Sequence, residues 1–195
     1  MIYSEGMEKI DVKIGTLVDF EKLARLDFAN NVENMFEVVQ GNMNLSLREV
    51  SLQKPLHNAS ANYSEEIMEE MIPKLLNANQ IPLVGFVNQQ PVGYLMANWQ
   101  QWPGGKIVVI DGILVERNSL GKGLAKSMIL ELIKLAKANK ECRGIHAEMD
   151  TTKYQANKLL MNMGFKFAGT KLYVYSSDNP FAGSKEALYF FYAIK

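Results

Sequence analysis

Two glycines flank a lysine at Gly121-Lys122-Gly123, directly before a run of residues with helical hydrophobic spacing. The first turn of a helix carries unpaired backbone N–H groups and the positive end of the helix dipole, so it attracts anions. Glycine lacks the Cβ atom that would hold a phosphate away from those N–H groups. The stretch therefore predicts a phosphate-binding loop at the start of a helix.

Two common nucleotide-binding motifs do not fit this loop. A Walker A motif needs a glycine five residues before its Gly-Lys pair, and Glu116 stands at that position. A Rossmann fingerprint needs a third glycine where this chain has Lys126, and it should lie early in a βαβ unit. A nucleotide or phosphosugar bound by the glycine loop in some other manner stays open as an interpretation.

The elements around the loop follow from hydrophobic periodicity and turn residues. Residues 83–99 predict a β-hairpin, and residues 106–115 predict a strand that is apolar apart from Asp111 and Gly112. The further elements expected are a helix over 123–140, a strand over 143–150, a helix over 152–163 capped by Asp150 and ended by Gly164, and strands over 165–175 and 187–195. This order predicts an α/β fold with a mixed sheet flanked by helices.

Residues 1–80 are predicted to be helical. Thr16 and Asp19 form a capping-box pattern ahead of apolar residues near helical spacing. A second helical stretch is expected over 64–78, bent or ended by Pro73. The polar segment 40–63 has no clear period, so it predicts a loop, a short helix or a lid.

The composition narrows the class of protein. The chain has 195 residues, of which 48% are hydrophobic, and we expect a single domain over 1–195. Its 21 basic and 21 acidic side chains balance, which argues against a general binder of nucleic acid or membranes. A single cysteine, Cys142, without zinc-type spacing predicts no metal and a cytoplasmic location. No signal peptide or membrane span is expected.

A third pattern fits the loop together with its surroundings. The stretch Leu120–Ala125, which follows the strand ending in 110–115, resembles the acetyl-CoA loop of the GCN5-related N-acetyltransferase (GNAT) superfamily. Gly123 and Ala125 occupy the small positions of that signature, and Leu120 replaces its Gln or Arg. The ending Met163-Gly164-Phe165 resembles the end of the family's motif B helix, with Ala156 at its small position. The resemblance covers about residues 82–195.

This resemblance implies a GNAT-like mixed, mostly antiparallel sheet and acetyl-CoA as co-substrate, without a metal. Residues 81–195 would form the CoA-binding core and residues 1–80 a helical substrate-side part. The residues implied in cofactor binding are Ile113, Leu114, Val115, Leu120, Gly121, Lys122, Gly123, Leu124 and Ala125.

Acetyl transfer to an amine also requires the amine to lose its proton. For a lysine-like amine of pKa ~10.4 that costs roughly 4.6 kcal/mol at pH 7, and a general base offsets it. Asp111 is the first candidate, since family members often carry Glu there, and Glu148 is the second. An acid at either position could instead be a structural cap or bind a cationic substrate. Leu160 stands where the family often has a Tyr that acts as general acid, and Tyr154 should lie on another face of the helix. No general acid is therefore assigned. His146 is expected to pack in the core.

The acceptor is suggested by aromatic residues. The chain is similar to the streptothricin acetyltransferase branch of GNAT enzymes, which acetylates an amine of a cationic antibiotic. Trp99 and Trp102 could hold a cationic amine and Tyr175 could line its pocket, with core packing as the alternative. The predicted function is acetyl transfer to a primary amine of a small molecule or peptide. Leu120 and Leu160 favour the alternative, a degenerate acyl-CoA sensor. The aromatic C-terminal strand could support a homodimer.

Overall fold

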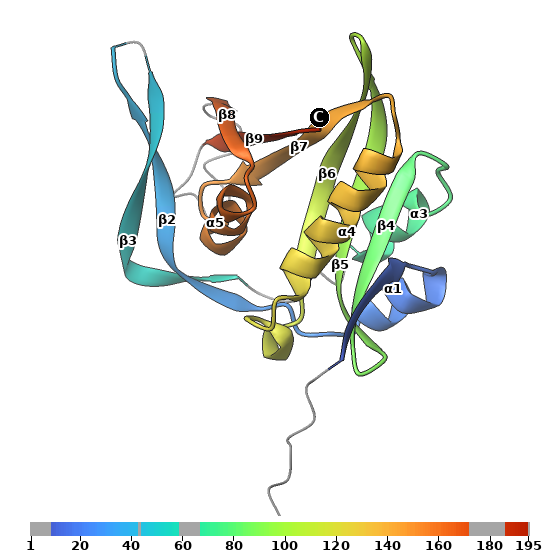
Figure 1. The fold of residues 1–195 in the computed structure, drawn as a ribbon. Coiled ribbons are helices and arrows are strands. Elements are labelled where there is room, and N and C mark those ends of the chain that lie inside the picture. Colours follow the sequence, from blue (N-terminus) through green and yellow to red (C-terminus); the bar gives the residue numbers. More distant parts are fainter. Residues whose placement is uncertain (1–8, 43, 59–66, 172–185, 195) are drawn as a thin grey trace, which may run out of the picture.

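A computed structural model of the protein describes residues 9–42, 44–58, 67–171 and 186–194. In this part of the chain a seven-stranded sheet has the order β1-β4-β5-β6-β7-β9-β8. Its strands are β1 (Ile10–Ile14), β4 (Gln80–Val87), β5 (Gln90–Trp102), β6 (Gly105–Val115), β7 (Cys142–Asp150), β8 (Lys166–Lys171) and β9 (Ala187–Ala193). Neighbouring strands are antiparallel except β6 and β7, which run parallel. The predicted mixed, mostly antiparallel α/β fold is confirmed (Figure 1).

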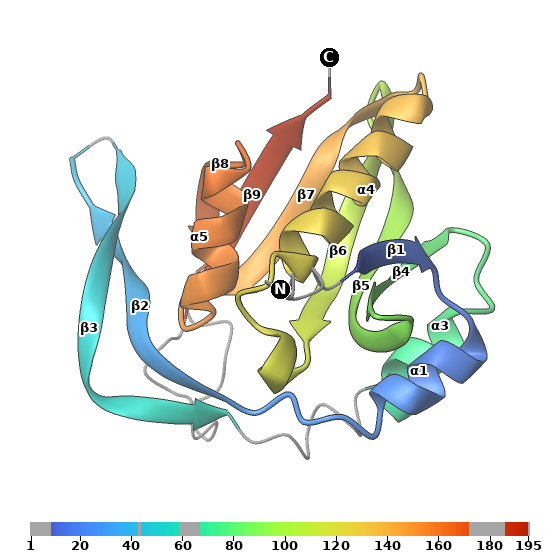
Figure 2. The same ribbon diagram turned by 60° about the horizontal axis from the view of Figure 1, so that its bottom comes forward.

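Helices cover both faces of the sheet. Because side chains alternate along a strand, Leu95 and Ala97 of β5 face one helical layer, whereas Tyr94 and Met96 face the other. The first layer is α4 (Leu124–Ala138) with α5 (Tyr154–Asn162), and the second is α1 (Leu17–Leu23) with the short helices η1 (Ile67–Met71) and α3 (Ile72–Lys74). Figures 1 and 2 show α4 lying along β6 and α5 beside β7 and β9.

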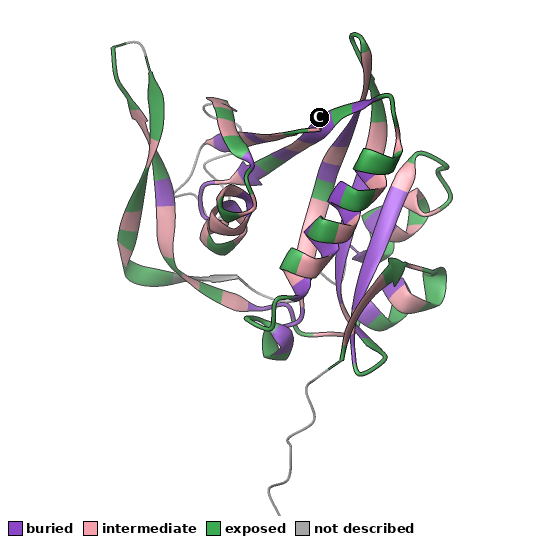
Figure 3. Cartoon of the chain, viewed as in Figure 1, coloured by how far each residue is buried: buried purple, intermediate pink, exposed green. Residues whose placement is uncertain are grey.

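The amphipathic pattern of α4 is confirmed. Leu124, Met128 and Leu132 are buried against the sheet, whereas Leu130 on the opposite side is exposed. Figure 3 shows this division as buried and exposed stripes along the helix. No helix in the described ranges is both long and apolar enough to cross a lipid bilayer.

The helical prediction for the first eighty residues is wrong over most of its described length. The capping box does form at α1, where Thr16 Oγ1 accepts the Asp19 N–H and the Asp19 carboxylate accepts the Thr16 N–H. The chain then forms an antiparallel ribbon of two strands, β2 (Asn30–Gln40) and β3 (Leu45–Asn58). Thus 45–58 is a strand rather than a loop, short helix or lid.

Buried and exposed side chains alternate along the ribbon with a period of two, but its many polar residues obscure this pattern in the sequence. Phe36 is buried and Val38 packs against the core, whereas Glu37 between them is exposed. A ribbon with one face against the protein and one face in water needs few apolar residues, so its sequence resembles a loop. The predicted helix over 64–78 is confirmed over 67–74, where η1 and α3 lie and α3 ends one residue after Pro73, whereas 75–78 are not helical.

The second helical prediction near the site needs one correction. α5 begins at Tyr154, and Asp150 does not cap it. Asp150 is the last residue of β7, and its Oδ1 accepts hydrogen bonds from the Thr152 N–H at 2.6 Å and the Thr152 hydroxyl at 2.9 Å. The carboxylate therefore stabilises the turn between strand and helix. Gly164 ends the helix as predicted, with a φ of 93°.

Candidate functional site

The two parallel strands of the sheet separate part-way along their length. The last pair joins Ile110 of β6 to Ala147 of β7, although β6 continues to Val115 and β7 to Asp150. On its other edge β6 stays paired with β5 as far as Val115. We call the gap beyond Ile110 and Ala147 the fork. Along it, alternate backbone N–H and C=O groups of β6 have no strand partner among the described residues.

A cavity of about 480 Å³ lies at the fork. Its walls come from β6, from the glycine loop with the first turns of α4, from the start of α5, and from a segment of residues 28–34 that includes the start of β2. Of the nine residues predicted to bind the cofactor, all except Lys122 line this cavity. The fold thus brings the strand residues 113–115 and the loop residues 120–125 other than Lys122 to one surface.

The glycine loop has the geometry that an anion requires. Gly121 and Gly123 have φ values of 76° and 84°, in the left-handed region that favours glycine. Gly123 is the N-cap of α4 and no side chain caps the helix, so the first N–H groups of a fifteen-residue helix stay available. A Cβ placed on either glycine would meet no atom within 4 Å. The space beside these backbone groups is open, as a bound phosphate needs.

A buried carboxylate that the sequence reasoning missed shapes the loop. Glu116 is 9% exposed and accepts hydrogen bonds from Asn118 Nδ2 at 2.8 Å and from Ser119 Oγ at 3.0 Å. These bonds hold the short 3-10 turn η2 (Arg117–Ser119) that leads into the glycines. A glutamate after an apolar strand gives no local signal of burial, so only the tertiary structure reveals this role.

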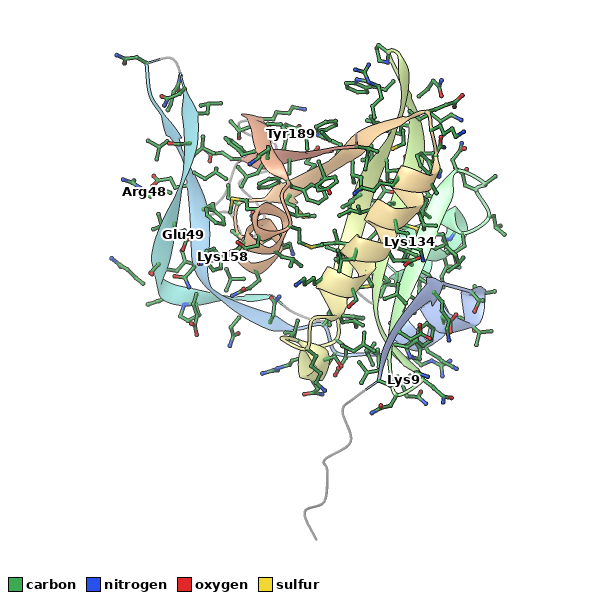
Figure 4. The ribbon with its side chains drawn as sticks, viewed as in Figure 1. Lys9, Arg48, Glu49, Lys134, Lys158 and Tyr189 are labelled. Atoms are coloured by element: carbon green, nitrogen blue, oxygen red, sulfur yellow. The ribbon has the colours of Figure 1, made fainter. Side chains whose placement is uncertain are left out.

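One side of α5, together with the residue before it, forms a second wall that the sequence did not predict as a unit. Lys153, Tyr154 and Leu160 all line the cavity. The Tyr154 hydroxyl donates to Glu49 Oε2 at 2.7 Å and accepts from Lys158 Nζ at 2.8 Å. Figure 4 shows these two partners, Glu49 on the ribbon and Lys158 on α5, so the hydroxyl is engaged with the ribbon. Leu160 is 1% exposed and offers no proton.

The two candidate bases lie where the fork begins. Asp111 directly follows the last paired residue of β6, and Glu148 directly follows that of β7. Asp111 is also the extra residue of a β-bulge, because Ile110 and Gly112 pair with consecutive residues of β5. Asn98 Nδ2 donates to Asp111 Oδ1 at 2.8 Å, and Asn98 shares a face of β5 with Tyr94 and Met96. Asp111 therefore lies on the face of the sheet opposite α4.

Glu148 lies on the same face, beside two aromatic residues. Ile145, Ala147 and Met149 point into the α4 side of the core, so His146 and Glu148 point the other way. The His146 ring stacks on Tyr189 at 5.5 Å between centroids, and Tyr189 donates a hydrogen bond to Glu148. Burial lowers the pKa of His146, with Glu148 acting in the opposite direction. Burial, and next the Glu148 charge, raise the pKa of Tyr189.

The predicted substrate aromatics are not brought to this place. Trp99 packs against the α4 side of the core. Trp102 is 54% exposed at the end of β5, and Asp111 lies some five residues away along the strand, roughly 17 Å. Tyr175 lies outside the described residues. The Trp99 side chain therefore packs against the core, and the Trp102 side chain lies at the surface.

Comparison with known proteins now bears on the site. The model of the acetyltransferase (GNAT) family matches residues 47–165, more than half of the chain. The chain belongs to the GNAT acetyltransferase family. Like other members, this GNAT protein is an acetyl-CoA-dependent N-acetyltransferase with acetyl-CoA as its co-substrate. The resemblance that its loop and motif B ending indicated is confirmed.

Solved structures extend the likeness to the whole fold of this acetyltransferase. A crystal structure of nourseothricin acetyltransferase has a TM-score of 0.75 and 16% identity, covering 95% of this chain and 99% of that one. A putative streptothricin acetyltransferase from Bacillus anthracis, in complex with acetyl coenzyme A, has a TM-score of 0.76 and 17% identity, covering 95% and 100%. Arabidopsis thaliana NAA60 with a bisubstrate analogue has a TM-score of 0.56 and 18% identity, covering 65% and 82%. A search of curated proteins finds no match.

The residues of the cavity fit acetyl-CoA. The glycine loop and the start of α4 supply backbone N–H groups for a pyrophosphate. Lys126 of α4 and Lys153 beside α5 also line the cavity and carry positive charge. The edge of 113–115, which pairs with no strand in the described ranges on the side of β7, offers backbone groups to an extended, amide-bearing chain. The substitution of Leu120 for the family's polar residue removes one side-chain contact and leaves these backbone groups in place.

Proposed function

We propose that this GNAT acetyltransferase moves the acetyl group of acetyl-CoA to a primary amine of a cationic small molecule or peptide by direct attack. The observation that supports the proposal is the location of Asp111 and Glu148. Both carboxylates follow the last paired residues at the fork, on the face opposite α4. An amine that approaches from this face meets negative charge beside the gap that leads to the cofactor cavity.

In the proposed reaction the amine nitrogen attacks the thioester carbonyl carbon, a C–N bond forms and the C–S bond breaks. Asp111, held by Asn98, takes the proton of the amine directly or through water. Backbone N–H groups on the free edge of β6 stabilise the charge that develops on the carbonyl oxygen. As the C–S bond breaks, the nitrogen releases its second proton, which passes through water to the leaving thiolate. A thiol pKa near 8.5 means that this protonation requires little help, and Leu160 provides none.

Two features of the chain belong to the same proposal. We also propose that the 195 residues act as one domain in the cytoplasm, with 1–80 on the acceptor side. The ribbon and α1 both contact the sheet that carries the fork, which supports a single domain. Trp102 and Tyr175 remain candidates for contact with a large acceptor that extends beyond the fork, and the aromatic β9 for contact with a second copy.

A second candidate function has a specific observation in its favour. Leu120 is 49% exposed beside the glycine loop, and Leu160 is buried where the family has an acid. A chain that has lost both polar groups can bind acyl-CoA and report on its level without turnover. This sensor would show CoA binding and no CoA release with any amine.

The proposal is tested by thermal melting with acetyl-CoA, ATP and NAD, followed by a CoA-release assay over a panel of amines. A ligand at 100 times its dissociation constant adds about 2.7 kcal/mol, which raises the melting midpoint by several degrees. We expect a shift with acetyl-CoA alone, and CoA release that requires both an amine and Asp111. A shift with ATP or NAD instead, or the absence of any shift, would refute the acetyltransferase function.

A further inference from the structure

One segment closes the open end of the fork. Residues 27–36, which we call the strap, lead from the end of α1 into β2 and are tied at both ends by backbone hydrogen bonds. The Arg117 N–H donates to the Asp27 carbonyl at 2.8 Å, and the Phe36 N–H donates to the Thr151 carbonyl at 3.1 Å. The first bond lies just before the glycine loop and the second just before α5. The strap therefore crosses from one side of the fork to the other (Figure 2).

The middle of the strap is irregular. Val32 pairs with Leu56 and Asn34 pairs with Ser51, so Glu33 has no partner on β3, where residues 52–55 stand opposite. Four residues of β3 thus face one residue of β2, so β3 is the bulged strand and the ladder is interrupted beside Glu33. Glu33 is one of the residues that line the cavity.

The positive and negative side chains that line the cavity lie on different walls. Lys126 and Lys153 belong to the helical side, where the phosphates of acetyl-CoA are expected, and Glu33 belongs to the strap. No ion pair joins Glu33 to a lysine or arginine among the described residues. A carboxylate repels the anionic cofactor and attracts a cation, so the strap side of the cavity favours a positively charged group.

We propose that Glu33 determines acceptor specificity by binding a second positive charge of the acceptor, apart from the amine that reacts. This rests on the proposed function, with the reacting amine beside Asp111. The acceptor class is then a polyamine or another molecule with two or more cationic amines. A neutral hydroxyl or a lone alkyl amine would gain nothing at the strap. Glu33 does not touch the reacting atoms, so it acts on acceptor binding and leaves the chemical step unchanged.

Glu37 provides a matched control on the same strand. It lies four residues beyond Glu33, is exposed, and pairs with Arg48 on the ribbon, away from the cavity. Both residues are glutamates of β2, so Glu33→Gln and Glu37→Gln remove the same charge from the same element. An effect of net charge alone would be equal in the two variants.

The experiment measures binding of spermidine and of butylamine to the CoA-loaded protein by calorimetry, together with binding of CoA itself. For Glu33→Gln we expect spermidine affinity to fall about three- to tenfold, between the effect of an exposed ion pair and that of a charge-assisted hydrogen bond. Butylamine affinity and CoA affinity should stay within twofold, and the spermidine effect should shrink at high salt. Glu37→Gln should match the wild type.

Equal spermidine binding by Glu33→Gln and Glu37→Gln would overturn the proposal, as would an equal loss for butylamine and spermidine. Failure of the proposed function looks different, because the wild-type protein would then release no CoA with any amine. The binding measurements on Glu33 do not depend on turnover, so the two results can be separated.

Discussion

The backbone of the glycine loop leads to a sharp prediction for Gly123→Ala. Gly123 has a φ of 84°, and a non-glycine residue in the left-handed region costs about 1–2 kcal/mol. For a chain of this size 1 kcal/mol corresponds to about 2–4 °C, so the melting midpoint should fall by about 2–8 °C. The new methyl group meets no protein atom within 4 Å, so strain alone accounts for this loss.

The effect on the ligand should be larger than the effect on stability. The methyl group of Gly123→Ala occupies the open space beside the first N–H groups of α4, where the phosphates are expected to lie. Loss of a hydrogen bond to a charged group costs about 1.5–3 kcal/mol, so the dissociation constant of acetyl-CoA should rise about 10- to 150-fold. Calorimetry at a temperature where the variant is fully folded measures this constant directly.

Gly164→Ala separates the two effects. Gly164 also has a left-handed φ, 93°, and its added Cβ would lie 3.6 Å from a Tyr192 ring carbon, an ordinary contact. It ends α5 and does not line the cavity. The control should lose similar stability yet bind acetyl-CoA within twofold of the wild type. Equal weakening of acetyl-CoA binding in both variants, or none in Gly123→Ala, would refute the anion-binding role of the loop.

Three further predictions follow from the site and its surroundings. Asp111→Asn keeps an oxygen for the Asn98 bond but removes the base, so kcat should fall about 10²- to 10⁴-fold with acetyl-CoA affinity unchanged; a loss below threefold would exclude a base role. The Tyr154 hydroxyl and a nearby lysine lower the pKa of Glu49, so this carboxylate stabilises the fold above its ordinary pKa of 4.5 and less as the pH falls through the lowered value. Glu49→Gln should therefore melt below the wild type at pH 7, and the difference should vanish in acid; a constant difference would contradict this. Burial raises the pKa of Cys142, so a thiol reagent at pH 8 should label the protein only after denaturation, and rapid labelling of the folded protein would contradict its position.

The parts of the site that the sequence predicted are those with local causes. A strand, two glycines and an amphipathic helix within residues 106–140 need no distant partner to be recognised, and the structure has all three. The candidate bases Asp111 and Glu148 were proposed one at a time, each from its place in a predicted strand. Their common location depends on the register of β6 against β7, which no local pattern contains.

The parts that the sequence did not predict depend on contacts between distant residues. The ribbon reads as a loop because only Phe36 and its neighbours on one face are buried, and its partner α5 lies more than a hundred residues away. Glu116 and Tyr154, and Glu33 in its proposed role, were absent from the predicted site residues for the same reason. Trp99 was one of two tryptophans predicted to contact the acceptor, yet it packs against the core, because a large aromatic satisfies either role equally well.

The two backbone hydrogen bonds that hold the strap also determine when this segment can fold during synthesis of the chain. Residues 27–36 leave the ribosome early, but their partners are the Arg117 N–H and the Thr151 carbonyl, and Glu49 of the ribbon must wait for Tyr154. Because a non-local contact forms only after its second partner has been made, the ribbon stays unsupported until about three-quarters of the chain has emerged. The wall that closes the cofactor cavity is therefore translated near the beginning and folded near the end.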